Sequence, residues 1–371
     1  LLARHYWPDG KCLDLFSTHE KNLFSIEKVF GKNSATEFDK FHGDSKTLFY
    51  AFNNTLLRNG SPGSFLTKKD FLKRIPRLIN ILGFPTNYWR KLEKYFSEPK
   101  LRQLFGRYAT YVGGMPQTAP ALLSLIWQAE AQGVWTIDGG MHKLARVIEA
   151  LCIERDVEFS YNCRVKSIKK NEKTATLVIL NTDEAIHVDT VVFNGDPRAI
   201  ALGYLGQDVQ NSVPNIAKEE RSLSAYVWGF DAKCTGPDLV HHNVFFADTP
   251  NSEFRDIAQG HMPTDPTIYV CAQDRGKSLA PPEIENFELI LNAPPLTQRQ
   301  PEKEDFERCN EITFQRLEQF GLSFQGKRAR QHLTMPQDFE ALFPASGGSL
   351  YGQSPKGMMA TLKRPKCTTQ L

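Results

Sequence analysis

Asp138 stands directly before two glycines and a run of apolar residues at helical spacing. Gly139 and Gly140 let a ligand approach the backbone closely, and the N–H groups of a helix start attract negative charge. An acid at this expected strand-to-helix junction suits proton transfer or stabilisation of positive charge. Asp is also a favoured N-cap residue, so the alternative is that Asp138 only caps the helix.

A second candidate ligand site follows the apolar residues 191–193, which predict a short buried strand. The next four residues are Asn194, Gly195, Asp196 and Pro197. A glycine at position 195 permits close approach of a ligand to the backbone. The same four residues are typical of a plain turn, which is the alternative interpretation.

No metal site and no hydrolase site are expected from the sequence. The nine histidines show no H-E-x-x-H spacing, and G-x-S-x-G is absent. His142 is interpreted as a solvated or capping residue. The seven cysteines are widely spaced without a C-x-x-C pair, which favours neither zinc nor a disulfide framework and indicates a reducing cytoplasm.

The elements that must position these candidates predict a mixed α/β class. Apolar spacing predicts helices over residues 18–133, 141–152 and 304–320. It predicts hairpins over 6–16 and 176–188, and a strand over 157–165. Further strands are expected at 224–230, 244–247, 268–272 and 287–291. A length of 371 residues suits two domains, and a net charge of +3 argues against a nucleic-acid partner.

Residues 67–84 predict a basic amphipathic helix, kinked at Pro76. Its positive charges are Lys68, Lys69, Lys73, Arg74 and Arg77. Such a helix can lie in a membrane interface. The alternative is an ordinary helix whose apolar side faces the core. No apolar run is long enough to predict a membrane-spanning helix.

Several motifs together resemble the bacterial phytoene-desaturase-like carotenoid desaturases. They are R-Y-A-T-Y-V-G-G-M-P at 107–116, L-I-W-Q-A-E at 125–130, G-V-W-T-I-D-G-G at 133–140, F-E-A-L-F-P at 339–344 and G-G-S-L-Y-G at 347–352. The opening W-P-D-G-x-x-L-D-L-F at 7–16 is similar to the branch that acts on hydroxylated or methoxylated carotenoids, the hydroxyneurosporene and methoxyneurosporene desaturases. The resemblance covers nearly the whole chain.

This resemblance implies a two-domain FAD-dependent oxidoreductase with a Rossmann-like dinucleotide-binding domain. The expected division is a substrate- and membrane-facing segment at 1–135, the middle of the FAD domain at 136–203, a second substrate segment at 204–340 and a return toward the FAD domain at 341–371. The family's G-x-G-x-x-G turn is not present in this sequence. The expectation is therefore a fragment that lacks both ends of the cofactor site.

The resemblance also implies roles for individual residues. Those expected to contact FAD are Val165, Asn194, Gly195, Asp196, Gly139 and Gly140. Those expected to contact substrate are Trp135, Tyr111, Gly348 and Tyr351. Asp138 is the expected catalytic residue, although better-known phytoene desaturases have an arginine at the matching place.

The implied reaction is FAD-dependent desaturation, in which a hydride leaves one carbon for flavin and a proton leaves its neighbour. The expected partners are a 1-hydroxy- or 1-methoxy-carotenoid, a membrane surface bound from the cytoplasm, and oxygen or a quinone as electron acceptor. Phytoene desaturation, or a related saturase or isomerase activity, is the alternative within the class. A non-catalytic membrane-surface fragment is the alternative from another class.

Overall fold

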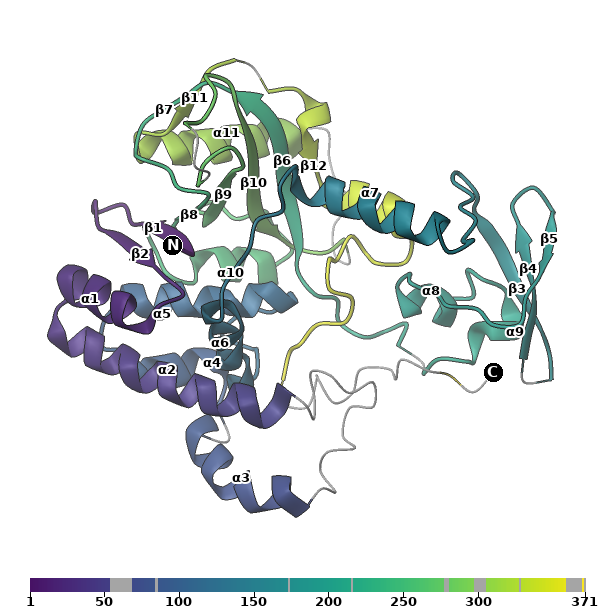
Figure 1. Ribbon diagram of the computed structural model, residues 1–371, viewed down its shortest axis with the longest axis horizontal. Helices are drawn as coiled ribbons and strands as arrows, with labels where there is room; N and C mark the ends of the chain where they lie inside the picture. Colours follow the sequence, from purple (N-terminus) through teal and green to yellow (C-terminus); the bar gives the residue numbers. More distant parts are fainter. Residues whose placement is uncertain are drawn as a thin grey trace. The chain divides into compact units, whose positions relative to one another are not determined.

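The computed structural model forms two compact units (Figure 1). Unit 1 comprises the described residues of Leu1–Gly133 and Glu219–Lys366, and unit 2 comprises those of Val134–Lys218 and Cys367–Leu371. The structure describes residues 1–53, 69–83, 86–172, 174–214, 216–276, 280–296, 305–326, 328–357 and 369, without the side chains of 69–74. The chain therefore leaves unit 1, forms unit 2 and returns to unit 1.

A seven-stranded sheet is the framework of unit 1. Its order is β12 (Leu333–Thr334), β6 (Ser224–Ala232), β10 (Glu285–Ala293), β9 (Ile268–Ala272), β8 (His242–Phe245), β1 (Ala3–Tyr6) and β2 (Cys12–Leu15). Neighbours pair antiparallel except β1 and β8, which are parallel with Arg4 opposite Asn243. This one parallel pair joins the start of the chain to strands far along the sequence.

One face of this sheet packs against helix α11 (Asp305–Gln319). In β6 and β10 the buried positions alternate, as expected for strands with one face in a core. Phe287 lies opposite Phe230 in the register, so both rings lie on the same face. Phe314 of α11 meets Trp228 edge-on, with ring centroids 5.3 Å apart. The short strands β7 (Cys234–Thr235) and β11 (Ser323–Phe324) pair with each other and extend this core.

Helices form the rest of unit 1. They are α1 (His19–Phe30), α2 (Lys32–Phe52), α3 (Lys69–Leu82), α4 (Tyr88–Tyr95), α5 (Pro99–Gly106), α6 (Leu125–Ala131), α10 (Ser252–Ala258) and α12 (Pro336–Leu342), with 3-10 segments η3 (Arg107–Val112), η4 (Ala121–Ser124) and η5 (Arg330–His332). Their core is aromatic, and Phe38, Phe41, Phe96, Phe105 and Trp127 are all fully buried. Within the described ranges, every helix is too short or too polar to cross a bilayer.

The described part of α3 packs on the core. Leu78 is 4% exposed and lies with Ile75 and Leu82 against a cluster that includes Leu48 of α2. This matches the core alternative for these positions. Pro76 lies inside the helix, as expected. Lys68 lies outside the described residues, as do the side chains of Lys69, Lys73 and Arg74.

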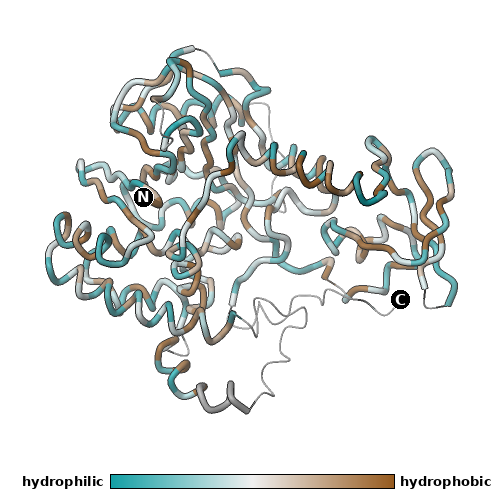
Figure 2. Tube along the Cα trace, in the orientation of Figure 1, coloured by the Kyte–Doolittle hydropathy of each residue, from teal (hydrophilic) through white to brown (hydrophobic). Residues whose placement is uncertain are grey.

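Unit 2 contains helix α7 (Gly140–Ile153) and an antiparallel sheet of β3 (Val165–Asn171), β4 (Thr174–Leu180) and β5 (Ala185–His187). Short helices α8 (Pro197–Ala201) and α9 (Gln207–Gln210) follow. Its buried hydrophobic cluster is small: Ile168, Ala175, Leu205 and Val209. Hydrophobic residues recur along α7 (Figure 2), yet none of its residues is buried.

Most elements expected from the sequence are confirmed, including the first hairpin, α7, the β4–β5 hairpin, the strands of β6, β8, β9 and β10, and α11. Three expected strands are wrong: residues 157–163, residues 191–193 and the approach to Asp138 have no strand pairing. A strand exists only through hydrogen bonds to a neighbour, and the described sheet of unit 2 ends at β3 and β5. Val192 is accordingly 90% exposed.

Candidate functional site

Arg107 is the centre of an aromatic group in unit 1. Its guanidinium lies 5.4 Å from the ring centroid of Tyr111 and 5.5 Å from that of Tyr269. It also donates a hydrogen bond of 3.1 Å to the Tyr111 hydroxyl. A guanidinium between two ring faces is stabilised by cation–π attraction while it remains planar and charged. This arrangement fixes a positive charge beside a half-exposed tyrosine.

The tyrosines of this group stay protonated at neutral pH. Burial raises the pKa of Tyr111 to about 12, although the field of Arg107 opposes the shift. Burial and the nearby Glu130 carboxylate raise the pKa of Tyr108 well above its usual range. The Tyr108 hydroxyl donates to Glu130 Oε1 at 2.8 Å. Both phenols are therefore hydrogen-bond donors, suited to polar atoms rather than to proton abstraction.

The positive charge of Arg107 also acts on a buried carboxylate, that of Glu253 in α10. It is 3% exposed and accepts hydrogen bonds from the Thr267 backbone N–H at 2.9 Å and the Asn292 side chain at 2.5 Å. Burial raises the pKa of Glu253, and these hydrogen bonds and Arg107 oppose the rise. Two fixed donors are the arrangement that lets a buried carboxylate keep its charge.

Gly113 brings the turn after η3 against the loop that contains Tyr351. Gly113 has φ of 73°, and a Cβ built on it would lie 2.6 Å from Ser222 Cβ and 2.7 Å from Tyr351 Cδ2. Ser222 Oγ accepts from the Tyr351 backbone N–H at 3.0 Å. Only glycine fits this close approach at this backbone angle. Tyr111 and Tyr351, which are 38% and 42% exposed, thus flank one glycine turn of unit 1.

The loop around Gly348 is held from inside by Glu340 of α12. The Glu340 carboxylate accepts from the backbone N–H of Ala345 at 3.0 Å and of Gly347 at 2.6 Å. Arg221 donates to the carbonyl of Ser346 at 2.9 Å. Gly348 is buried with φ of 68°, and a Cβ there would collide with Pro336. The loop geometry is therefore set before any ligand arrives.

The start of α7 in unit 2 presents backbone donors without a side-chain cap. The N-cap residue is Gly139, with φ of 83°, and no side chain bonds to the first turn. Asp138 is exposed and is not the cap, so the capping alternative for Asp138 is wrong. The reason is geometric: the left-handed turn is at Gly139 itself, one residue nearer the helix. A Cβ on Gly140 would meet nothing within 4 Å, so space adjoins this turn.

The second candidate segment forms a turn that starts helix α8. Asp196 is the N-cap of α8, and its carboxylate accepts from the Arg198 backbone N–H at 2.9 Å. Asn194 and Gly195 before it are exposed. Val165 is the first residue of β3 and pairs with Leu180. Trp135, near the start of the unit, is 78% exposed.

The family follows from comparison with known proteins. Residues 90–234 match the family described as flavin containing amine oxidoreductase. The chain is 46% identical over 371 residues to the hydroxyneurosporene desaturase of Cereibacter sphaeroides, covering 100% of this chain and 74% of that protein. It is 41% identical over 370 residues to the protein of that name from Rhodobacter capsulatus, with the same coverage of both. The chain belongs to the hydroxyneurosporene desaturase family.

The family resemblance drawn from the motifs is thereby confirmed. A solved structure, the CLA-producing fatty acid isomerase from P. acnes, aligns with a TM-score of 0.50 at 14% identity, over 88% of this chain and 66% of that one. This likeness concerns the fold alone. The mixed α/β class is confirmed, and the expected domain boundaries stay predictions.

For this desaturase-family chain, the predicted site residues divide between the units. Tyr111, Gly348 and Tyr351 lie in unit 1, and the other predicted residues lie in unit 2. Sequence reasoning missed Arg107 and Glu340 as individuals, although both lie inside the motifs 107–116 and 339–344. The available signal was that Arg107 stands four residues before Tyr111, a spacing at which side chains of one helical turn can meet. Tyr269 had none, because only the fold brings it to Arg107.

Proposed function

We propose that this protein catalyses the FAD-dependent desaturation of a carotenoid that bears a 1-hydroxyl or 1-methoxyl group, in carotenoid biosynthesis. The observation that supports this most strongly is the 46% identity to a hydroxyneurosporene desaturase along the whole chain. The match of residues 90–234 to a flavin-containing oxidoreductase family supports a flavin as the redox group. The expected division into substrate segments at 1–135 and 204–340 and FAD-domain segments at 136–203 and 341–371 belongs to the same proposal.

The backbone groups at the start of α7 have the chemistry needed to bind a flavin nucleotide. A helix start without a side-chain cap, a left-handed Gly139 and open space at Gly140 suit an anionic or carbonyl oxygen of a ligand. Asn194, Gly195 and Asp196, with the Val165 backbone, are the other proposed contacts. When bound, FAD supplies the acceptor for the hydride removed from the substrate. The chain's own residues position the substrate and exclude water.

Asp138 is proposed to act as a carboxylate in the site, as a base and as a stabiliser of positive charge. Its carboxylate is exposed and is not used to cap α7. A free carboxylate beside the substrate stabilises positive charge on the polyene as hydride leaves, and it accepts the proton lost from the adjacent carbon. Loss of one hydride and one proton forms one new carbon–carbon double bond. Oxygen or a quinone then takes up the electrons.

Aromatic side chains are proposed to hold the substrate. Tyr111 and Tyr351 flank the Gly113 turn, and Trp135 offers an exposed ring in unit 2. Ring faces pack well against a flat polyene. The Tyr111 hydroxyl and the Arg107 guanidinium behind it are donors suited to a hydroxyl or methoxyl oxygen. This donor pair would distinguish an oxygenated carotenoid from a hydrocarbon such as phytoene.

The test of the reaction is product analysis. The enzyme is expressed in cells that make 1-hydroxy-, 1-methoxy- or unsubstituted carotenoids, and the pigments are extracted. Desaturation lengthens the conjugated system, so the absorption of the hydroxylated or methoxylated pigment is expected to move to longer wavelength. A shift seen with phytoene alone would favour the phytoene desaturase alternative. A product with fewer double bonds or an unchanged number would indicate a saturase or isomerase, and no product would favour a non-catalytic fragment.

Binding at a membrane surface is part of the same proposal, because the substrate dissolves in lipid. The basic residues of the 67–84 segment are proposed to contact anionic headgroups. Changing Lys68, Lys69, Lys73, Arg74 and Arg77 to Gln is expected to reduce co-sedimentation with anionic vesicles at low salt. The matched control changes five exposed lysines of α1 and α2: Lys21, Lys28, Lys32, Lys40 and Lys46. Equal losses in both variants would show that vesicle binding depends on the net charge of the protein and not on the 67–84 segment.

A further inference from the structure

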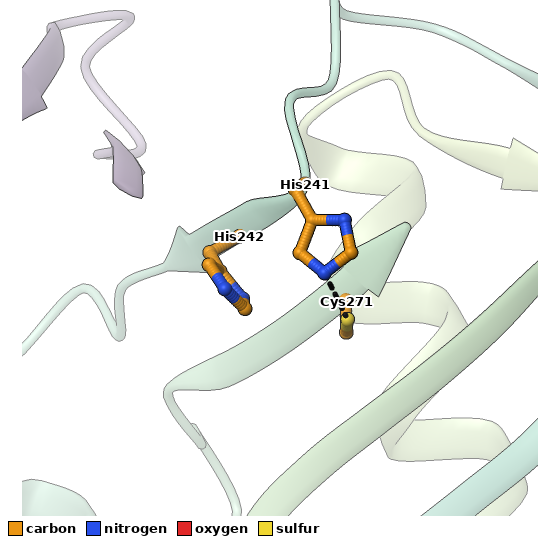
Figure 3. A group of neighbouring side chains, drawn as sticks. All are labelled: His241, His242 and Cys271. Carbon is orange, nitrogen blue, oxygen red and sulfur yellow. Dashed lines mark hydrogen bonds between the residues drawn. The ribbon is translucent and has the colours of Figure 1, made fainter. Parts of the chain in front are cut away.

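Three potential metal ligands gather on the sheet of unit 1, and none of them has a role in the proposed reaction. His241, His242 and Cys271 each offer one ligand atom, and these atoms all lie within 4.8 Å of one another (Figure 3). His241 Nε2 lies 3.6 Å from Cys271 Sγ. The two imidazole rings meet nearly at right angles, with centroids 4.5 Å apart. The group thus contains two nitrogens and one sulfur.

The register of the sheet explains why these side chains converge. His242 of β8 lies directly opposite Cys271 of β9 in the antiparallel pair, so both side chains lie on the same face. His241 immediately precedes β8, and its carbonyl accepts from the Ala272 backbone N–H at 2.9 Å. On the other side, Glu288 of β10 lies opposite Cys271. A carboxylate therefore stands in the same row of the sheet as the thiol and an imidazole.

The orientation of His241 is fixed by a bond that leaves its ligand nitrogen available. His241 Nδ1 lies 2.9 Å from the carbonyl oxygen of Arg275, an acceptor, so Nδ1 must hold the proton. The other nitrogen, Nε2, then presents a lone pair toward Cys271. A ligating histidine usually has its second nitrogen bonded to a carbonyl or carboxylate in this way. The Tyr269 hydroxyl lies 2.6 Å from His242 Nδ1 and orients this ring, and Nε2 is the ligand nitrogen in the tautomer in which the hydroxyl accepts.

We propose that His241, His242 and Cys271 form a binding site for a thiophilic metal ion, for which Zn²⁺ has the right chemistry, with water or the Glu288 carboxylate as fourth ligand. Zn–N bonds of about 2.0 Å and Zn–S bonds of about 2.3 Å at tetrahedral angles place nitrogen and sulfur about 3.5 Å apart. The separation of 3.6 Å between His241 Nε2 and Cys271 Sγ agrees with this spacing. Imidazole with thiolate is a ligand set that selects zinc over magnesium or calcium.

A catalytic cysteine is the competing interpretation of the same pair, and the local environment argues against it. Cys271 is only 6% exposed, so little of its sulfur is open to attack on a substrate. Metal coordination needs no such exposed face, and it releases the thiol proton to solvent. The thiol thus fits a ligand better than a nucleophile.

The experiment titrates the full chain, stripped of metal with a chelator, with Zn²⁺ against a chromophoric competitor. One equivalent is expected to bind. Co²⁺ serves as a second probe, because a cobalt–thiolate bond gives a charge-transfer absorption in the near ultraviolet that nitrogen and oxygen ligands alone do not. Cys271→Ser is expected to abolish this absorption and to weaken Zn²⁺ binding by more than the roughly 10–100-fold that loss of an outer-shell partner costs.

His241→Gln is the second variant, because His241 is partly exposed and its replacement leaves the sheet core unchanged. It is expected to weaken Zn²⁺ binding while keeping the far-ultraviolet circular dichroism of the parent. Cys163→Ser and His187→Gln, two exposed residues of unit 2, are the matched controls and should bind as the parent does. The proposal is overturned if the parent binds no stoichiometric Zn²⁺, or if Cys271→Ser and His241→Gln bind it as tightly as the parent.

Discussion

The two units bury their hydrophobic residues very differently. In unit 1, the aromatic rings around Phe105 are fully buried, and Phe105 itself contacts Phe41, Phe96 and Trp127 at centroid distances of 4.8–5.5 Å. In unit 2, α7 has no buried residue, and Ile148 is 52% exposed. Helical periodicity predicted α7 as well as it predicted the helices of unit 1. Periodicity thus predicts the element, whereas the contribution of that element to stability depends on what covers it.

The largest effect is expected in the core of unit 1. Phe105→Ala removes a fully buried ring and leaves a cavity, which typically costs about 3–5 kcal/mol. The free energy of unfolding, measured by urea titration with circular dichroism, is the test. A loss below 1 kcal/mol would mean that the aromatic cluster is not the stabilising core of this unit.

The next effect concerns activity rather than stability. Asp138→Asn removes the charge proposed to act on the polyene, and general acid–base catalysis is typically worth on the order of 100-fold or more in rate. Because the N-cap of α7 is Gly139, the melting temperature and flavin content should not change. Turnover of the oxygenated carotenoid is the readout. Near-normal turnover would show that the Asp138 carboxylate is not needed and that flavin and polyene suffice for the reaction.

Alanine substitutions at two glycines with similar backbone angles distinguish the cost of a steric collision from the cost of backbone strain. Gly113→Ala and Gly140→Ala both place a side chain at φ near 80°, which costs about 1–2 kcal/mol. Only at Gly113 does the new Cβ also collide with Ser222 and Tyr351. Thermal unfolding should therefore show a larger loss for Gly113→Ala. Gly140→Ala should instead reduce flavin binding if the ligand approaches that backbone, and equal losses of stability would refute the comparison.

The smallest effect is expected on α7. Ile148→Ala is expected to change the free energy of unfolding by no more than about 0.5 kcal/mol, as is usual at an exposed site. The measurement is the same urea titration, so Ile148 and Phe105 can be compared directly. A loss near 3 kcal/mol for Ile148→Ala would show that α7 is covered in solution.

Local patterns predicted much of this fold. β9 was predicted at its observed bounds, and α7 and α11 were predicted within about a residue, since each has its own strong spacing. The strand expected at 157–163 was wrong because alternating apolar residues do not by themselves provide a neighbouring strand to hydrogen-bond with. The Asp138 cap was wrong because the choice between two adjacent cap positions depends on one backbone angle.

The candidate sites were harder to predict than the elements. Tyr111 was singled out through its motif, but its partner Tyr269 lies on a different strand. His241 and His242 were not expected to bind metal, because the histidines of the sequence show no H-E-x-x-H spacing. Cys271 reaches them only through the β8–β9 register, which composition and spacing do not contain.

The parallel pairing of β1 with β8 also constrains when the sheet can form. β1 and β2 are synthesised well before their partner strand β8, because residues 134–218 of unit 2 lie between them in the sequence. Until then one edge of the β1–β2 hairpin has no strand to pair with, and closing so long a loop is slow. We therefore expect the β1–β2 hairpin to dock late during synthesis, and unit 1 to be most prone to aggregation while residues 134–218 are being translated.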